Sequence, residues 1–248
     1  MSSLNKGLAI LDLYCSRTAE LGVTEAARHL NIPKSSASRL MAAMARQGLL
    51  EVEEKTRRYR PGFLAFRLGS LYQSHASLVD LADQAVGDLA ERYAVTGYVS
   101  LLDRTNIIVM RMRHGSTPLR TIVSEPGSCE PAFNTAAGRA LLARMDDSVL
   151  KDLVPPVCEG EDGKRVRSKE WLKLLDAMRA RGWAEASHYE GQIGAIAVAV
   201  VPDDTKTKPV ALSLSFPQTS VDAACRTRMV GDLVRCAEDL SRRFRVPH

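Results

Sequence analysis

Apolar side chains recur every three or four residues in three segments near the start of the chain, at 4–15, 23–30 and 34–47. This spacing gives each segment one apolar face and predicts three short amphipathic helices. The connection at 31–33 between the second helix and the third is tight. The pair therefore predicts a helix-turn-helix unit.

Local signals place the ends of these helices and predict a hairpin after them. We expect Thr24 to cap the second helix, Pro33 to set the first turn of the third, and Gly48 to end the third at its C-cap. Two short strands are expected at 49–52 and 59–60, with a basic hairpin tip between them. A basic hairpin after a helix-turn-helix is typical of a wing.

The segment 63–72 is apolar on more than one face. A helix that is apolar all round must be buried somewhere, so we expect this segment to lie between two chains or against a docked second domain. Packing on its own wing is the alternative. An amphipathic helix is expected next, at 78–93, with Leu78, Val86 and Leu89 in register.

The rest of the chain alternates between apolar strands and amphipathic helices. Strands are expected at 98–102, 107–112, 120–124, 193–201 and 210–216, and helices at 136–145, 147–153, 170–181 and 221–244. Asn134 or Thr135 is expected to cap the helix that begins at Ala136, and we expect a charged loop at 155–167. Because strands come as neighbouring hairpins with helices grouped between them, the pattern predicts an α+β domain with an antiparallel sheet.

Composition narrows the class of protein. The chain has 248 residues, of which 45% are hydrophobic, and this suits one large or two ordinary domains. No apolar run approaches the roughly 20 residues of a membrane helix, and the first residues lack the features of a signal peptide. The five scattered cysteines are expected to be free thiols in a reducing cytoplasm. We therefore expect a cytoplasmic protein with no membrane segment, no metal site and no cofactor.

The excess of positive charge is confined to the first third of the chain. Residues 1–75 contain eleven Lys and Arg against six Asp and Glu, a net charge of +5, which equals the net charge of the whole chain. Residues 76–248 are therefore neutral overall. A local basic excess is the electrostatic footprint of nucleic-acid binding, so duplex DNA is the expected partner of the first third.

The outer face of the helix at 34–47 has the chemistry of a recognition helix. Small, hydroxylated and cationic side chains permit close approach to a major groove, contacts to phosphates and bidentate binding of guanine. An ordinary solvated surface is the alternative. The expected DNA-binding residues are Thr24, Lys34, Ser35, Ser36, Ser38, Arg39, Arg57, Arg58 and Tyr59.

Several short blocks follow one another along the chain, at 33–36, 39–40, 59–62, 68–69, 135–143, 181–184, 196–198 and 211–215. In this order they resemble the IclR-type family of bacterial transcriptional regulators. The resemblance implies a winged helix-turn-helix DNA-binding domain at 1–62, a linker helix at 63–77, and an effector-binding and oligomerisation domain at 78–248 with a curved antiparallel sheet flanked by helices. It also implies a homodimer, often paired into a dimer of dimers, that binds palindromic double-stranded operator DNA.

Small residues open the helix at 136–145, and its backbone N–H groups and positive dipole end suit a carboxylate. From the residues alone, tight packing on the sheet is the favoured explanation. The family resemblance reverses this, because it implies a pocket there for a small organic acid or an aromatic metabolite. The expected effector-binding residues are Phe133, Asn134, Thr135, Ala136, Ala137, Gly138, Glu190, Ile193, Ala195, Ser213 and Ser215.

The chain departs from the family pattern around this pocket. Phe133 stands within a stretch where Leu-His-Ala is usual, Arg139 replaces the usual Lys, and Ala199 stands where Pro is common. His188 or Glu190 takes the place of a Glu that the family commonly shows. These changes leave the identity of the effector open.

Two other classes of protein remain as alternatives. An enzyme would need a nucleophile elbow, a Walker loop, an HExxH motif or paired carboxylates, and the sequence contains none of these, so we predict no catalytic residue. A winged helix that binds single-stranded RNA would need aromatic residues on which bases stack. Residues 34–58 contain none, and Tyr59 alone, just after this range, is weak support. We therefore expect a regulator rather than an enzyme, and the sequence leaves open whether it activates or represses.

Overall fold

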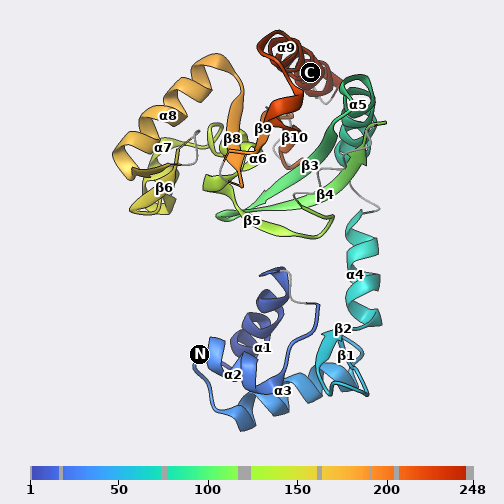
Figure 1. The fold of residues 1–248 in the computed structure, drawn as a ribbon. Coiled ribbons are helices and arrows are strands. Elements are labelled where there is room, and N and C mark those ends of the chain that lie inside the picture. The colour runs from blue at the N-terminus through green and yellow to red at the C-terminus, as the bar shows by residue number, and fades with distance from the viewer. Residues whose placement is uncertain are drawn as a thin grey trace. The chain divides into compact units, whose positions relative to one another are not determined.

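The computed structural model describes residues 2–16, 19–73, 77–116, 124–160, 164–189, 191–203 and 207–243. The chain divides into two compact units, Met1–Ala76 and Ser77–His248, and each has a hydrophobic core of its own. Helices and antiparallel strands occur in both (Figure 1). Within the described ranges, none of the helices has the length and apolar character needed to cross a membrane.

The first unit is a winged helix-turn-helix. Its elements are α1 (Ser3–Asp12), the 3-10 helix η1 (Leu13–Ser16), α2 (Val23–His29), α3 (Lys34–Arg46), β1 (Leu50–Val52), β2 (Tyr59–Pro61) and α4 (Phe63–Gln73). The core joins Ile10 of α1, Ala26 of α2, Met41 of α3 and Leu50 of β1. The three predicted helices, the hairpin and the apolar helix after it are confirmed.

Two predicted helix starts in this unit are wrong. Thr24 does not cap α2, because the helix begins one residue earlier, with Gly22 as its N-cap. The Glu25 carboxylate reaches back and accepts the Gly22 N–H at 3.4 Å, which replaces the expected threonine cap. Pro33 is the N-cap of α3 and not a residue of its first turn. Gly48 does follow the end of α3, with a φ of +73° that suits glycine there.

The second unit is built on one antiparallel sheet of six strands in the order β5-β4-β3-β10-β9-β8. Its elements are α5 (Ser77–Tyr93), β3 (Thr96–Asp103), β4 (Asn106–His114), β5 (Cys129–Pro131), η2 (Ala132–Asn134), α6 (Ala136–Leu142), α7 (Asp147–Leu153), β6 (Val157–Glu159), β7 (Arg165–Arg167), α8 (Ser168–Arg181), β8 (Ala184–His188), β9 (Ile193–Val200), β10 (Val210–Pro217), η3 (Gln218–Ser220) and α9 (Ala223–Arg243).

The curled sheet lies between two layers of helices (Figure 1). Gly97 of β3 faces α5, since a Cβ there would meet Val86 and Ala90 of that helix. Its neighbour Tyr98 therefore points to the other face, where it joins α6 and α8 in the main core. Helices α5 and α9 cover one face of the sheet, and α6 covers the other.

Most elements predicted for this unit are confirmed, with corrections at short or polar segments. The supposed loop at 155–167 contains the β6–β7 hairpin, and the short strands β5 and β8 were not predicted. The helix expected at 136–145 ends at Leu142, where the N–H groups of Arg144 and Met145 bond only three residues back, and Arg179 of α8 donates to two carbonyl groups beyond that end. Its Nε donates to Ala143 and its Nη2 to Met145, each at 2.9 Å. The strand expected at 120–124 falls outside the described residues except for Ser124.

Candidate functional site

Helix α3 presents its predicted reading face to solvent. The side chains on this face, Lys34, Ser35, Ser38 and Arg39, are exposed, and Ser36 is half-buried. On the opposite face Ala37 and Met41 are fully buried. The hydroxyls and cations of α3 are thus held outward by a helix whose other side is fixed in the core.

A groove of about 500 Å³ opens between the start of α2, the start of α3 and the wing. It brings together four of the predicted DNA-binding residues, Thr24, Lys34, Arg57 and Arg58. Arg28, from the last turn of α2, lines the same groove and was not predicted. Its signal in the sequence is a basic residue on the polar face of the helix that precedes the recognition helix.

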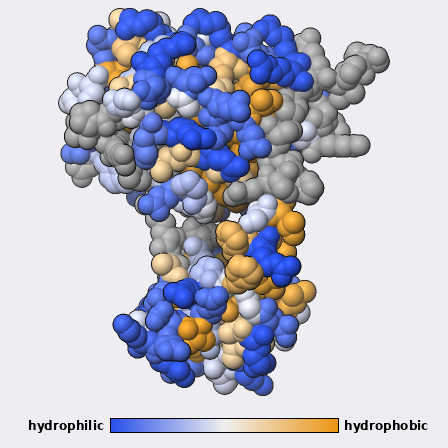
Figure 2. All heavy atoms as spheres, turned by 90° about the vertical axis from the view of Figure 1, so that its right-hand side faces the viewer, coloured by the Kyte–Doolittle hydropathy of each residue, from blue (hydrophilic) through white to orange (hydrophobic). Residues whose placement is uncertain are grey.

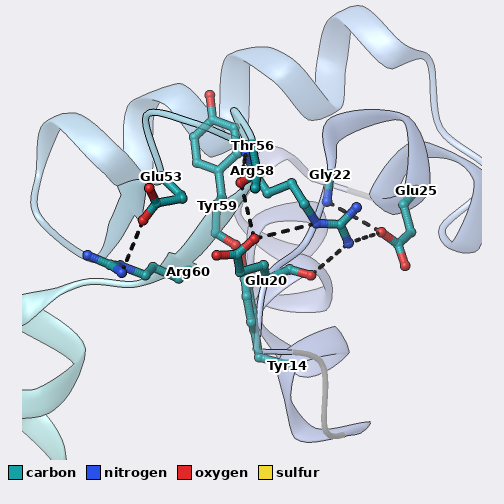
Figure 3. A network of polar contacts seen from close by, with 9 residues as sticks. All are labelled: Tyr14, Glu20, Gly22, Glu25, Glu53, Thr56, Arg58, Tyr59 and Arg60. Atoms are coloured by element: carbon teal, nitrogen blue, oxygen red, sulfur yellow. Dashed lines mark hydrogen bonds and ion pairs between the residues drawn. The ribbon is translucent and has the colours of Figure 1, made fainter.

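Cations on this surface differ in whether they have a partner. Counting only residues that the structure describes, no carboxylate lies within ion-pair distance of Lys34, Arg39 or Arg57. Arg58 differs, because its Nη2 donates to Glu25 Oε2 at 2.7 Å and to the carbonyl oxygen of Glu20 at 2.8 Å (Figure 3). That contact holds the pKa of the Glu25 carboxyl below its usual value.

The side chain of Tyr59, like that of Arg58, contacts the first unit itself, and it packs against the core of that unit. Its backbone pairs with Leu21, and its carbonyl oxygen accepts the Tyr14 hydroxyl at 2.9 Å. Burial raises the pKa of Tyr14 to about 12, so this donor stays protonated. Tyr59 anchors the base of the wing, whereas Arg57 is exposed at the tip with a φ of +56°.

In the second unit, the start of α6 is packed tightly. Thr135 caps the helix as predicted, and its Oγ1 accepts the Gly138 N–H at 3.1 Å. Ala136 and Ala137 are buried, and a Cβ added to Gly138 would overlap the backbone of Ala132 in η2. Close packing therefore explains the small residues, and the Gly138 amide is already bonded to Thr135.

Ser213 and Ser215 of β10 lie on the sheet face that α6 covers. Ser213 sits between Tyr98 and Ala197 in one cross-strand row, and both neighbours belong to the core under α6. Ser215 follows on the same face, next to Ala195, and its hydroxyl donates to a backbone carbonyl of β9 at 3.5 Å. The structure thus brings together the two serines, Ala195 and the α6 layer.

The remaining residues predicted for the effector have different surroundings. Phe133 is 3% exposed and meets Trp171 of α8 edge to face, with ring centroids 5.1 Å apart. It therefore fills the core between η2 and α8. Asn134 and Ile193 are half-buried, and Glu190 lies outside the described residues.

Arg139 ties together the elements around this face. Its side chain is buried and donates to the carbonyl oxygens of Phe133, Glu159, Gly160 and Glu185 at 2.7–3.0 Å. One guanidinium thus links α6 to η2, to β8 and to the β6–β7 hairpin.

His188 ends β8 on the same face, paired with Ile193. Burial first, and then the charge of Arg139, holds the pKa of His188 below its ordinary value. The imidazole is therefore neutral at pH 7, available as a donor and an acceptor.

Two family models match the chain. Residues 70–242 match the model described as bacterial transcriptional regulator IclR C-terminal, and residues 3–54 match the IclR helix-turn-helix domain. The HTH-type transcriptional regulator KdgR of Escherichia coli K12 is 28% identical over 224 residues, which cover 88% of this chain and 82% of that protein.

Two solved structures are similar in fold. An IclR-type regulator from a Silicibacter species has a TM-score of 0.85 at 20% identity, over 98% of this chain and 96% of that one. An IclR homologue from Microbacterium hydrocarbonoxydans, complexed with 4-hydroxybenzoate, has a TM-score of 0.74 at 18% identity, over 97% and 98% of the two chains. Because one family model alone spans most of the chain and the other covers its helix-turn-helix, this protein belongs to the IclR family and is a DNA-binding transcriptional regulator, not an enzyme.

Proposed function

We propose that this regulator acts in the cytoplasm and binds a palindromic operator as a dimer. Its affinity for the operator changes when a small organic or aromatic acid binds to the second unit. The observation that carries the proposal is the exposed face of α3, with Lys34 and Arg39 free of carboxylate partners among the described residues. Such a face suits a major groove, where arginine binds guanine bidentately. Arg57 on the wing then contacts the phosphate backbone.

The test begins with a duplex that the wild-type protein selects from a randomised pool. Arg39→Ala is expected to cost about 1–3 kcal/mol of binding free energy and to relax the preference at one base position. Arg228→Ala removes the same charge from an exposed position on α9 and serves as the matched control. If the double variant Lys34→Ala/Arg39→Ala binds the selected duplex as tightly as the wild type, α3 is not the reading helix.

The surface of α4 supports the dimer. Phe63, Phe66, Leu68 and Leu71 are each more than half exposed, and Figure 2 shows apolar side chains gathered along this helix. Contiguous exposed apolar surface marks an interaction site. We assign this face to a second copy of the chain, since an operator palindrome requires two reading heads related by a two-fold axis.

The effector site proposed for the second unit is the sheet face beside α6. The hydroxyls of Ser213 and Ser215 and the neutral imidazole of His188 are hydrogen-bonding groups on a face otherwise rich in alanine. Few polar groups among apolar walls are typical of small-molecule sites. The homologue that carries 4-hydroxybenzoate supports an aromatic acid as the ligand class, and titration calorimetry with a panel of aromatic and aliphatic acids tests it.

A further inference from the structure

The wing tip is tied to the rest of the first unit by a set of side-chain contacts that we call the wing network: Glu20, Glu25, Thr56 and Arg58 (Figure 3). Arg58 bridges Glu25 and the Glu20 carbonyl group, as described above. Glu20 Oε2 accepts the Thr56 hydroxyl at 3.1 Å, and the Thr56 oxygen accepts the Arg58 N–H at 3.3 Å. The network therefore joins the tip both to α2 and to the loop before it.

The base of the wing is held separately, by backbone contacts. Leu21 and Tyr59 exchange two backbone hydrogen bonds of 2.8 and 2.9 Å, and the Tyr14 hydroxyl donates to the Tyr59 carbonyl oxygen. These contacts fix where the wing begins. They leave the direction of its tip to the wing network, because β1 and β2 are only three residues long.

The direction of the tip matters because the groove has cations on two sides. Lys34 lines it from α3 and Arg57 lines it from the wing. The distance between these two charges depends on the angle of the wing. Arg58 is the residue of the tip that pairs with α2, through its ion pair with Glu25.

We propose that Arg58 is a positioning residue for operator binding: its bonds to Glu25 and Glu20 hold the wing at the angle at which Arg57 and Lys34 reach one DNA backbone. This role rests on the DNA-binding function proposed above. Arg58 itself does not contact a phosphate. A direct phosphate contact by Arg58 is the competing role, and the two roles predict different results.

Glu25→Gln separates them, because removing a negative charge from a DNA-binding surface by itself strengthens binding to a polyanion. If Arg58 acts by positioning, this variant loosens the wing and weakens binding to the selected duplex about threefold to tenfold, as for one partly exposed charge-assisted contact. Glu25 Oε2 accepts both the Gly22 N–H and the Arg58 guanidinium; glutamine keeps one neutral oxygen there, so the start of α2 is preserved while the contact to Arg58 loses its charge. Glu54→Gln, at an exposed carboxylate of the same wing, is the control and should not weaken binding.

Salt dependence gives a readout that a purely structural role would not move. Each phosphate contact contributes about 0.9 to the slope of log K against log salt. Glu25→Gln removes no cation, so a slope lower by about 0.9 means that Arg57 has lost its phosphate. Arg58→Gln should give the same slope, and the double variant should bind no more weakly than either single one, because both changes break one contact.

Amide hydrogen exchange in DNA-free protein tests the network itself. Arg58→Gln should speed exchange at the tip, 56–58, and leave the Tyr59 amide slow, because Tyr59 remains paired with Leu21. Unchanged exchange at the tip would overturn the role of Arg58. A Glu25→Gln variant that binds the selected duplex at least as tightly as the wild type would overturn it too. A wild-type protein that selects no duplex would refute the proposed function together with this role.

Discussion

Replacing Arg139 with methionine should destabilise the second unit more than any exposed substitution. This side chain is 1% exposed, and methionine matches much of its volume without its donors. The change therefore leaves four carbonyl groups without the guanidinium that they share. Those carbonyl groups belong to η2, to β8 and to the β6–β7 hairpin, so three elements lose their common tie to α6.

The size of the effect follows from two opposing terms. The four contacts, at 2.7–3.0 Å, have charge-assisted lengths, and each such bond contributes about 1.5–3 kcal/mol. Burying a guanidinium costs several kcal/mol in return. We expect a net loss of about 3–5 kcal/mol in the free energy of unfolding, because the four lost bonds together outweigh the recovered cost of burying the guanidinium. This is a large share of the roughly 5–15 kcal/mol of a typical domain.

The assay is urea unfolding of the full chain, followed by tryptophan fluorescence. Both tryptophans, Trp171 and Trp183, belong to the second unit, so fluorescence reports that unit alone. Arg144→Met, at an exposed position just beyond α6, is the control and should change stability by no more than about 0.5 kcal/mol. If Arg139→Met costs less than about 1 kcal/mol, the carbonyl groups find other donors and the reasoning about this tie is wrong.

Phe66→Glu should shift the protein from dimer to monomer in light scattering at micromolar concentration, whereas Lys173→Glu on α8 should not; a dimer in both would exclude α4 as the interface. Ser213→Ala should lower affinity, in calorimetry, for the acid of the panel that the wild-type protein binds most tightly and leave DNA affinity unchanged, and equal ligand affinity would place the pocket elsewhere. A bulky residue at Ala136 is a poorer probe, because it would overpack a buried site. Asp232 links α5 to α9, and its pKa is lowered chiefly by the Tyr93 hydroxyl, so the stability lost in Asp232→Asn should shrink as pH falls below about 4 and stay constant above it.

The parts of the fold that sequence could predict are those with long, regular periodicity. The helices at 34–47 and 78–93 have enough repeats for one apolar face to stand out, and the strands at 193–201 and 210–216 stand out as long apolar runs that the structure buries on both faces. The segments that were missed are short or atypical. Strands β5, β6 and β7 have three residues each, and β8 is rich in alanine, a residue with low strand propensity.

The sequence could predict which residue types make up the candidate sites, but not which way each side chain points in the fold. Arg58 and its partner Glu25 are separated by 33 residues, so local sequence treats Arg58 as one more cation of the wing tip. Only the folded hairpin brings the two together. The small residues of α6 pose the same problem in reverse. Both an open pocket and a tight contact between elements require a small residue at Gly138. The structure shows the tight contact, because the backbone of Ala132 fills the space where a Cβ would lie.

The direction of individual arginines changes the electrostatic argument for DNA binding. The net charge of the first third already sets Arg58 against Glu25, and Arg60 against Glu51 and Glu53, the carboxylates with which these arginines form ion pairs. Because each of these arginines already has a carboxylate partner, we expect it to add less to DNA binding than a cation without one. Among the described residues Lys34, Arg39 and Arg57 have no such partner, and we expect these three to contribute most to the attraction for DNA. Since Lys34 and Arg57 line one groove from α3 and from the wing, a change in the angle of the wing would move one charge relative to the other, and we expect affinity to depend on that angle as well as on the number of cations.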